Sequence, residues 1–329
     1  MKAMLLDSYG SAATFRLAEV ARPQVKPGHV LLRVVATSVN PIDVKIRTLG
    51  LPLAPELPAI LHGDVAGVVE EVGLGVTGFQ PGDEVFGCVG GVKGSGGALA
   101  EYLLADACLL AHRPTSCSLA ECAALPLVTL TAWEGLIDRA NIRPGDPVLV
   151  HAGAGGVGHI ALQLARLRGA VVTTTVSSPG KAKLARELGA DHTIDYRTTS
   201  VADQVRHTPQ GLGFSLVFDT VGMNTLDASF QAVRPGGTVV TCVARSTHDL
   251  SALHAKGVSL HVVFMLLPLL TGQGRAHQGD VLRRTAALVD AGRLRPLLHP
   301  RQFSLAEIQQ AHAVVAEGKA MGKVLVRVD

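Results

Sequence analysis

The sequence predicts an α/β protein of two domains, one rich in β-strands and one built on a doubly wound parallel sheet. Three observations lead to this prediction. The chain of 329 residues corresponds to about two domains of ordinary size. Strands alternate with helices between residues 148 and 264. A glycine-rich loop at residues 153–158 separates the first of these strands from the helix that follows it.

Composition restricts the classes of function. Apolar residues make up 47% of the chain and charged residues 17%, enough for buried cores, and the formal net charge is only +3 with the basic residues dispersed. We therefore expect no nucleic acid as the main partner. The most apolar segment, Val258–Leu270, is too short to span a bilayer and is interpreted as a buried strand and its exit, so no membrane is expected.

The start of the chain and the cysteines indicate the compartment. Asp7 interrupts the apolar start before a signal-peptide core can form, so secretion is not expected. The five cysteines are an odd number and form no C-x-x-C pair. This usage fits reduced thiols in the cytoplasm.

Residues 1–110 predict a mostly antiparallel β domain. The segments are short, punctuated by glycine and rich in β-branched residues, and no long helix is evident. Proline presets the first central position of a turn and glycine supplies the positive φ of the next, so a Pro-Gly pair before an apolar run predicts a turn that begins a strand. Four such pairs occur: Pro27-Gly28, Pro81-Gly82, Pro144-Gly145 and Pro235-Gly236.

The pattern changes near residue 118. Ser118 and Glu121 have the spacing of a capping box, and apolar residues then recur through Ala140 with a break at Pro126. The expected strands are 148–151, 171–176, 193–194, 216–218, 238–243 and 258–264. The expected helices are 157–168, 181–188, 199–206, 224–233 and 249–255. This alternation predicts the doubly wound parallel sheet.

The tail has helices near 279–291 and 304–317 and a final strand at 323–328. With no linker before it, we expect the tail to rejoin the first domain. The expected division is therefore 1–124 with 265–329 for the β-rich domain, and 125–264 for the parallel-sheet domain.

Gly153, Gly155 and Gly158 form a G-x-G-x-x-G pattern with a strand before it and a helix after it. Gly153 is expected to permit a tight turn, Gly155 to let backbone approach a pyrophosphate, and Gly158 to let the helix lie close to the sheet. Dinucleotide binding is the interpretation, with Ala154, Gly156 and Val157 in the same loop. A purely structural turn would need only one such glycine.

The residues after Val176 favour NADP(H) over NAD(H). An NAD-preferring fold carries Asp or Glu here to bind the ribose 2′-hydroxyl. This chain instead has Ser177 and Ser178, with Lys181 soon after. Two hydroxyls and an ammonium suit a 2′-phosphate. A solvated surface lysine remains the alternative for Lys181.

Taken together, the motifs along nearly the whole chain resemble the medium-chain dehydrogenase/reductase superfamily, within it the zinc-independent quinone oxidoreductase (ζ-crystallin-like) branch. The segments that carry the resemblance are Ser38–Asp43, Gly63–Val69, Pro81–Val85, Gly97–Tyr102, Leu130–Trp133, Ala152–Gly158, Phe218–Gly222, Arg234–Gly237 and Gly322–Val324. The resemblance implies a GroES-like β-rich catalytic domain beside the nucleotide domain, and NADPH as cofactor. It also implies that Lys181, Tyr196 and Lys319 hold the 2′-phosphate.

Relatives of this branch differ in whether they bind a catalytic zinc. Zinc-dependent members place cysteines where this chain has Asn40 and Val128-Thr129, and a Gly-His-Glu where it has His62-Gly63-Asp64. Because a catalytic zinc needs about three converging protein ligands, we expect no metal. The alternative is that His62 and Asp64 bind a metal together with a distant cysteine. We favour structural roles, with His62 as a turn residue and Asp64 as a hydrogen-bonded loop aspartate.

The predicted activity is NADPH-dependent hydride transfer to a quinone, with a site between the two domains. Asn40 and Thr131 are candidate donors to the oxygen that gains charge, and Asp43 is the third catalytic candidate. Solvent can protonate the hydroquinone, so no dedicated acid is required. A turn residue is an equal interpretation of Asn40, which precedes Pro41.

Two other functions stay open. One is reduction of α,β-unsaturated carbonyls, alkenals or enones, on the same scaffold. The other is a non-catalytic NADPH-binding protein of the crystallin kind, or an RNA-binding role, against which the dispersed charge argues.

Residues 257–264 should form the last strand of the sheet, with an apolar edge that must be covered by another surface. The resemblance implies a homodimer that pairs these edges.

Overall fold

The structure, a computed structural model, describes residues 1–328. The chain divides into two compact units, which are described separately. Unit 1 comprises Met1–Leu130 together with the chain from Leu266 onward, and unit 2 is Thr131–Met265. The first division falls within helix α3 (Pro126–Trp133). The sequence analysis places the divisions after residues 124 and 264.

Unit 1 is built on a mostly antiparallel sheet. The strand order is β14-β15-β3-β4-β5-β7, with β6 paired to the first half of β3 and β15 to its second half, and with β1-β2 as a separate ladder. The strands are β1 (Lys2–Leu6), β2 (Phe15–Glu19), β3 (His29–Val39), β4 (Asp64–Val72), β5 (Glu84–Cys88), β6 (Tyr102–Asp106), β7 (Leu110–His112), β14 (Phe303–Ser304) and β15 (Val324–Arg327). The expected antiparallel β domain is confirmed, and β15 pairs with β3.

Strand β3 is the centre of this sheet. Its residues are nearly all buried, as expected for a strand covered on both faces. Gly28 before β3 has φ 74° and Gly82 before β5 has φ 94°, so the first two Pro-Gly pairs are the predicted turns. Such φ values are strained for residues with a Cβ.

The helices of unit 1 include one that the sequence analysis missed. They are α1 (Pro41–Leu49), α2 (Leu119–Cys122), α9 (Leu267–Thr271), α10 (Arg275–Asp290) and α11 (Ile308–Ala316), with 3₁₀ turns at Ala107–Leu109 and Leu305–Glu307. No long helix was expected before residue 110, and α1, with nine residues, is a shorter helix that this expectation left out. Its signals were Asn40 at the N-cap, Pro41 at the first helical position and an acid in the first turn.

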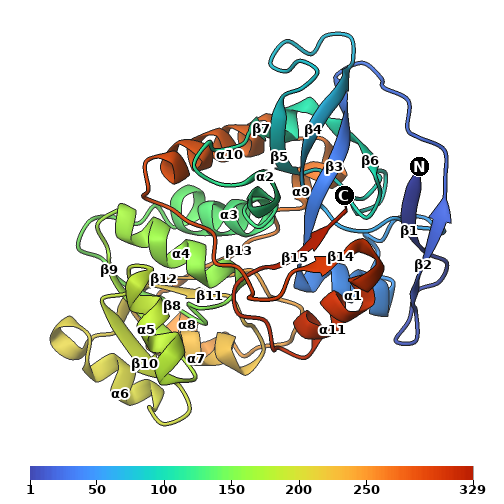
Figure 1. The fold of residues 1–329 in the computed structure, drawn as a ribbon. Coiled ribbons are helices and arrows are strands. Elements are labelled where there is room, and N and C mark those ends of the chain that lie inside the picture. The colour runs from blue at the N-terminus through green and yellow to red at the C-terminus, as the bar shows by residue number, and fades with distance from the viewer. Residues whose placement is uncertain (329) are drawn as a thin grey trace. The chain divides into compact units, whose positions relative to one another are not determined.

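Unit 2 is a parallel sheet in the order β10-β9-β8-β11-β12-β13, a doubly wound topology (Figure 1). Its strands are β8 (Pro147–Val150), β9 (Val171–Val176), β10 (His192–Asp195), β11 (Phe214–Asp219), β12 (Val233–Thr241) and β13 (Ser259–Val262). Strand β9, Val-Val-Thr-Thr-Thr-Val, consists entirely of β-branched residues, which favour strands. The predicted fold class is confirmed.

The helices of unit 2 lie close to their predicted positions. They are α4 (Gly156–Leu167), α5 (Pro179–Glu187), α6 (Val201–Arg206), α7 (Asn224–Ala232) and α8 (Ser251–Lys256), with a π-helix at Glu134–Arg139 and a 3₁₀ turn at Pro209–Gly211. Ser118 accepts a hydrogen bond from the Glu121 N–H, so the predicted capping box begins α2.

Two details of this sheet differ from expectation. The Pro235-Gly236 pair lies inside β12 rather than before it, and the register against β11 shifts there, so the pair forms a bulge. Strand β13 is the predicted last strand, but its residues are exposed or half-buried, because no strand within residues 1–328 pairs with its outer edge. The interpretation of Val258–Leu270 as a buried strand is therefore wrong.

One helical stretch, Leu119–Arg139, is long and apolar enough to cross a membrane by length and composition alone. Within its apolar window of 18 residues, 78% are buried inside the protein. The core helix of a non-membrane protein has the same two properties, so this stretch is weak evidence for a span.

Candidate functional site

The glycine-rich loop follows β8 directly. Ala152 has φ 54° and is the left-handed residue of the turn, a role that the sequence analysis gave to Gly153. Gly153 is required for a different reason, since a Cβ there would lie 2.3 Å from Thr174 Oγ1. That hydroxyl accepts the Gly153 N–H at 3.0 Å and so fixes the loop against β9.

The rest of the loop leads into α4. A Cβ on Gly158 would lie 2.2 Å from the Ala152 carbonyl oxygen, so this glycine lets the helix start against the turn. His159 N–H donates to the Gly155 carbonyl at 3.1 Å. Within residues 1–328 the N–H groups of Gly156, Val157 and Gly158 find no acceptor, as is usual for a first helical turn. They are donors for an anion at the positive end of α4.

Four of the predicted 2′-phosphate residues meet at the carboxyl end of β9. Lys181 Nζ donates to Ser177 Oγ at 3.2 Å, and Lys181 N donates to Ser178 Oγ at 3.3 Å, which makes Ser178 the N-cap of α5. Tyr196 N donates to the Val176 carbonyl at 3.4 Å. Tyr196 is 57% exposed, so it is not an ordinary half-buried aromatic, which is the structural alternative to a cofactor contact.

An acid and a base that the sequence analysis missed stand at the same edge. Asp195 ends β10 and lies opposite Val176 in the register. Arg197 donates to both of its carboxylate oxygens, at 3.0 and 2.8 Å, and the pKa of Asp195 is lowered to about 2 by these hydrogen bonds. The carboxylate is thus already paired with a guanidinium. The Asp-x-Arg spacing was the available signal.

These residues fit a dinucleotide with a 2′-phosphate. The loop offers unpaired backbone N–H groups for the pyrophosphate, and Ser177 with Lys181 offers a hydroxyl and an ammonium, while the nearest carboxylate is already paired. Lys319 belongs to unit 1, where its ammonium lies 2.5 Å from Glu317, and its assignment stays a prediction. Thr131 is buried in α3 at the start of unit 2, and its role also stays a prediction.

Asn40 and Asp43 are both buried at the start of α1. The Asn40 amide N–H₂ donates to Asp64 Oδ2 at 2.8 Å, and its oxygen accepts from the Lys323 ammonium. The backbone N–H of Asn40 donates to Asp43 Oδ2 at 2.7 Å. Both residues therefore also organise the helix start, beyond the turn role considered for Asn40.

Burial raises the pKa of Asp43 to about 7. The Asn40 N–H opposes this rise, the Asp64 carboxylate adds to it, and Lys323 opposes it. Burial therefore favours the protonated form of this side chain more than in an ordinary aspartate, a property found at many acid–base sites.

Asp64 is the centre of the buried network. Its Oδ2 accepts from Ser38 Oγ at 2.7 Å as well as from Asn40, and its Oδ1 accepts the Leu127 N–H at 2.8 Å. Lys323 Nζ completes the set at 3.3 Å. The hydrogen-bonded aspartate expected from the sequence is thus observed, whereas Lys323 was missed. The sequence feature that could have identified Lys323 was a single lysine directly before an apolar terminal strand.

His62 is paired with His312, again within unit 1. Thr37 Oγ1 donates to the Asp64 carbonyl at 2.6 Å, so it must accept from His62 Nδ1 at 3.1 Å. His62 Nε2 is then unprotonated and accepts from His312 Nε2, 2.8 Å away. Burial lowers the pKa of both rings, that of His312 to about 3. His62 also has φ 76°, the turn conformation that was expected.

Within residues 1–328 no group of three or more His, Cys, Asp and Glu side chains is arranged to hold a metal ion. Both nitrogens of His62 are engaged, one with Thr37 and one with His312. Both oxygens of Asp64 accept hydrogen bonds. The ligand pair considered in the sequence analysis is therefore committed to other partners.

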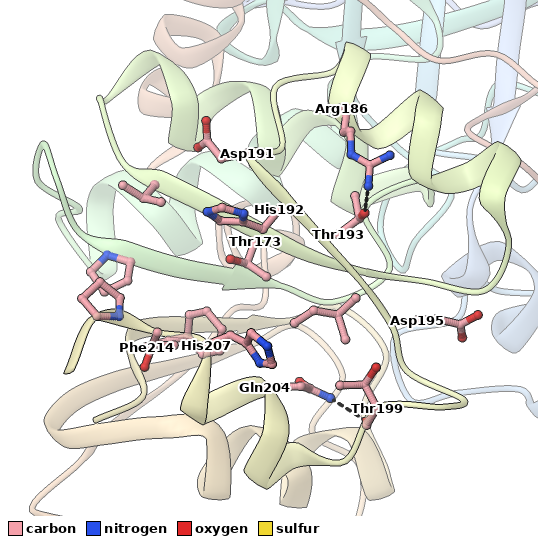
Figure 2. Close-up of a pocket in the computed structure, with 15 residues that line it drawn as sticks. Thr173, Arg186, Asp191, His192, Thr193, Asp195, Thr199, Gln204, His207 and Phe214 are labelled. Atoms are coloured by element: carbon pink, nitrogen blue, oxygen red, sulfur yellow. Dashed lines mark hydrogen bonds between the residues drawn. The ribbon is translucent and has the colours of Figure 1, made fainter. Parts of the chain in front are cut away.

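A cavity of about 690 Å³ opens beside β10 and α6 (Figure 2). Pro147, Val171 and Phe214 in its lining lie at the amino ends of β8, β9 and β11. Dinucleotides bind at the opposite, carboxyl edge of such sheets. No residue of the glycine-rich loop lines it, nor does Lys181. This cavity is not the predicted cofactor site.

Comparisons with known proteins agree with this architecture. Residues 26–115 match the alcohol dehydrogenase GroES-like domain family, and residues 188–326 match the zinc-binding dehydrogenase family. A 2-methylene-furan-3-one reductase of Solanum lycopersicum is 35% identical, over 99% of this chain and 79% of the relative. The chain belongs to the medium-chain dehydrogenase/reductase superfamily.

Two further members of this superfamily narrow the comparison. The NADPH-dependent alkenal/one oxidoreductase of Arabidopsis thaliana is 33% identical, over 99% of this chain and 79% of the relative. The crystal structure of the quinone oxidoreductase of Pseudomonas syringae pv. tomato DC3000 is 30% identical, with a TM-score of 0.88 over 99% of both chains. The protein is thus similar to oxidoreductases of both acceptor classes.

Proposed function

We propose that this protein is an NADPH-dependent reductase that transfers hydride to quinones. The observation that carries the proposal is the cluster of Ser177, Ser178 and Lys181 at the carboxyl end of β9, one strand along from the glycine-rich loop. Dinucleotide sites occupy this edge, and a hydroxyl with an ammonium at this point suits the 2′-phosphate that distinguishes NADPH from NADH. The superfamily and the name of the NADPH-dependent relative agree with NADPH as the cofactor.

NADPH is the cofactor, and when bound it supplies the hydride. The N–H groups of Gly156, Val157 and Gly158 would hold the pyrophosphate, and Lys181 with Ser177 would hold the 2′-phosphate. Tyr196 and Lys319 are proposed as further contacts, the latter by resemblance alone. The chain's own contribution is to bind and orient the dinucleotide and to neutralise its charge.

Asn40 and Asp43 are the proposed catalytic residues, with Thr131 as a third. An amide nitrogen has two hydrogens, and Asn40 uses one of them on Asp64. The Asn40 side chain also hydrogen-bonds Asp43, so the second hydrogen would exchange that contact for an acceptor oxygen that gains negative charge. When Asp43 is protonated, its proton sits on Oδ1, because Oδ2 accepts the Asn40 N–H. That proton supports a role as an acid.

Reduction of α,β-unsaturated carbonyls is the second candidate. Both curated relatives described above are named as reductases of such compounds, at 35% and 33% identity. An enone must receive a proton on carbon after the hydride, whereas a hydroquinone exchanges its protons with water. A buried carboxylic acid such as Asp43 is more useful in the first reaction.

We also propose that the reaction needs no zinc and takes place in the cytoplasm. The first proposal is supported by the engaged states of His62 and Asp64. The second is supported by the five cysteines, all of which are free thiols, three of them buried.

The test is NADPH oxidation by the purified protein across a panel of quinones, alkenals and enones, with NADH in parallel. The proposal expects turnover of quinones that exceeds turnover of alkenals and enones. Higher kcat/KM on alkenals or enones would establish the second candidate. NADPH binding without turnover of any acceptor would overturn both and favour a non-catalytic protein.

A further inference from the structure

A hydrogen-bonded chain of Ser246, His248 and Asp227 lies in unit 2, apart from the residues assigned above. Ser246 Oγ is 2.5 Å from His248 Nε2, and His248 Nδ1 is 2.7 Å from Asp227 Oδ1. Asp227 is in the first turn of α7. Ser246 and His248 lie in the segment after β12, which leaves the carboxyl edge of the sheet.

The order of these groups sets the positions of the protons. A carboxylate only accepts hydrogen bonds, so His248 Nδ1 carries the ring proton toward Asp227. The lone pair of Nε2 then faces the Ser246 hydroxyl and accepts a hydrogen bond from it. Nucleophilic hydroxyls are activated by this arrangement of a base held by a third group.

The histidine is held firmly and the serine is accessible. The His248 side chain is 9% exposed, and its ring meets the edge of the buried Phe230 ring at a centroid distance of 5.9 Å. Ser246 is half-buried, between Arg245 and Thr247, which are exposed. Within residues 1–328 the backbone N–H groups of Ser246 and Thr247 donate to no acceptor, so the segment that carries the hydroxyl also offers donors for an anionic oxygen.

We propose that Ser246 is a nucleophile, activated by His248 and Asp227, that takes acyl groups from small activated esters. Ser246 Oγ forms a bond to the acyl carbon while the bond from that carbon to the leaving oxygen breaks. The hydroxyl proton passes to His248 Nε2 and from there to the leaving oxygen, which departs with the bonding electron pair as an alcohol or phenol. Water then attacks the acyl serine, and His248 takes the proton of the water and returns it to Ser246 Oγ, which releases the carboxylic acid and restores the hydroxyl. No redox step is involved, so this activity is independent of the proposed reductase function.

A purely structural role is the competing explanation, because the same hydrogen bonds would also fasten the segment to α7. Reactivity separates the two. The full-length protein is incubated with p-nitrophenyl acetate, release of p-nitrophenolate is followed, and peptide mass spectrometry locates the acetyl group. The expected result is acetylation at Ser246 and its loss in Ser246→Ala. His248→Gln should lower the rate about a hundredfold, since general-base catalysis contributes at least that much.

The chain offers a matched control. Ser251 donates to the Asp249 carboxylate at 2.6 Å, so it has an acid partner but no histidine base. Ser251→Ala should leave the rate of p-nitrophenolate release unchanged. Asp227→Asn should lower it at least tenfold, since an asparagine holds the ring in the wrong tautomer. Acetylation of Ser246 no faster than that of Ser251, or a rate unaffected by His248→Gln, would overturn the proposal whatever the reductase assay shows.

Discussion

Lys323 Nζ lies 3.3 Å from Asp64 Oδ2, and the two side chains are only 3% and 0% exposed. Removing two charges from water is costly, and here the cost is offset by the hydrogen bonds that the Asp64 carboxylate collects. The pair joins the start of β4 to the start of β15. It also orients the Asn40 side chain, whose oxygen faces the ammonium and whose nitrogen faces the carboxylate.

Lys323→Met should therefore destabilise the protein by about 3–5 kcal/mol, because it leaves a buried carboxylate without its cation. Urea unfolding measures the effect. The double variant Lys323→Met/Asp64→Asn removes both charges and should lose less than the sum of the two single variants. Lys93→Met is a suitable control, since Lys93 is exposed. Strictly additive losses would show that the two charges do not stabilise one another.

Asp43 should make stability depend on pH. Burial raises its pKa from 3.8 to about 7, so between these values the folded protein holds a proton that the unfolded chain releases. The contribution of this group is complete below about pH 4 and is lost as the pH rises to about 7. Asp43→Asn cannot ionise, and its Oδ1 can still accept the Asn40 N–H.

The free energy of unfolding of Asp43→Asn, relative to the parent, should thus rise between about pH 4 and about pH 7 and level off above that. Urea unfolding across that range is the measurement. Titrating groups shared by both proteins, such as His62 and His312, cancel in the difference. A difference that stays constant with pH would mean that Asp43 is ionised throughout.

Local signals were sufficient for most of unit 2. Each strand is a short, mostly apolar or β-branched run, each helix follows at the expected distance, and Ser177, Ser178 and Lys181 are neighbours in sequence as well as in space. Sequence spacing predicts contacts of this kind because a helix N-cap joins residues only a few positions apart.

The buried cluster of unit 1 could not be predicted in the same way. Lys323 meets Asn40 across 283 positions of sequence, and His62 meets His312 across 250. Such pairs depend on the pairing of β15 with β3 and on α11, and nothing in the local pattern specifies them. The role of Ala152 was missed for a related reason, since glycine is the residue usually expected at positive φ.

Lys181→Ala should narrow the preference for NADPH over NADH about tenfold, equal to about 1.4 kcal/mol, because it removes the ammonium beside Ser177. Dissociation constants for both cofactors measure the change. Lys183→Ala is the matched control, because Lys183 lies on the same helix, is 81% exposed and faces Glu187. Equal affinity of the parent for both cofactors would contradict the assignment of the 2′-phosphate site.

The purified protein should contain no stoichiometric metal and should keep its reductase activity in a chelator. The physical reason is that the Lys323 ammonium already supplies a positive charge to Asp64, while His62 has both ring nitrogens hydrogen-bonded. Elemental analysis and turnover before and after chelation are the measurements. About one zinc per chain, with activity lost on its removal, would refute this prediction.

The outer edge of β13 leads to the last prediction. Val263 N–H donates to the Thr241 carbonyl, and N–H groups alternate in direction along a strand, so the Val262 N–H points away from β12. The side chains of Val262 and Phe264 are 50% and 41% exposed. An uncovered apolar edge of this kind invites pairing with another chain. We expect two chains to pair these edges in a closed two-fold homodimer.

Val262→Pro tests this pairing selectively. The sequence pattern of this strand does not indicate which amides face inward. In the structure, the proline removes an N–H that β12 does not use. Sedimentation should show a dimer for the parent and a monomer or aggregate for Val262→Pro, with the fold of residues 1–110 retained. Val262→Thr keeps the amide and should remain a dimer. His261→Pro removes an inward N–H and should instead weaken the β12–β13 pairing and lower stability. A parent that sediments as a monomer at micromolar concentration, or a dimer unaffected by Val262→Pro, would show that this edge is covered in another way.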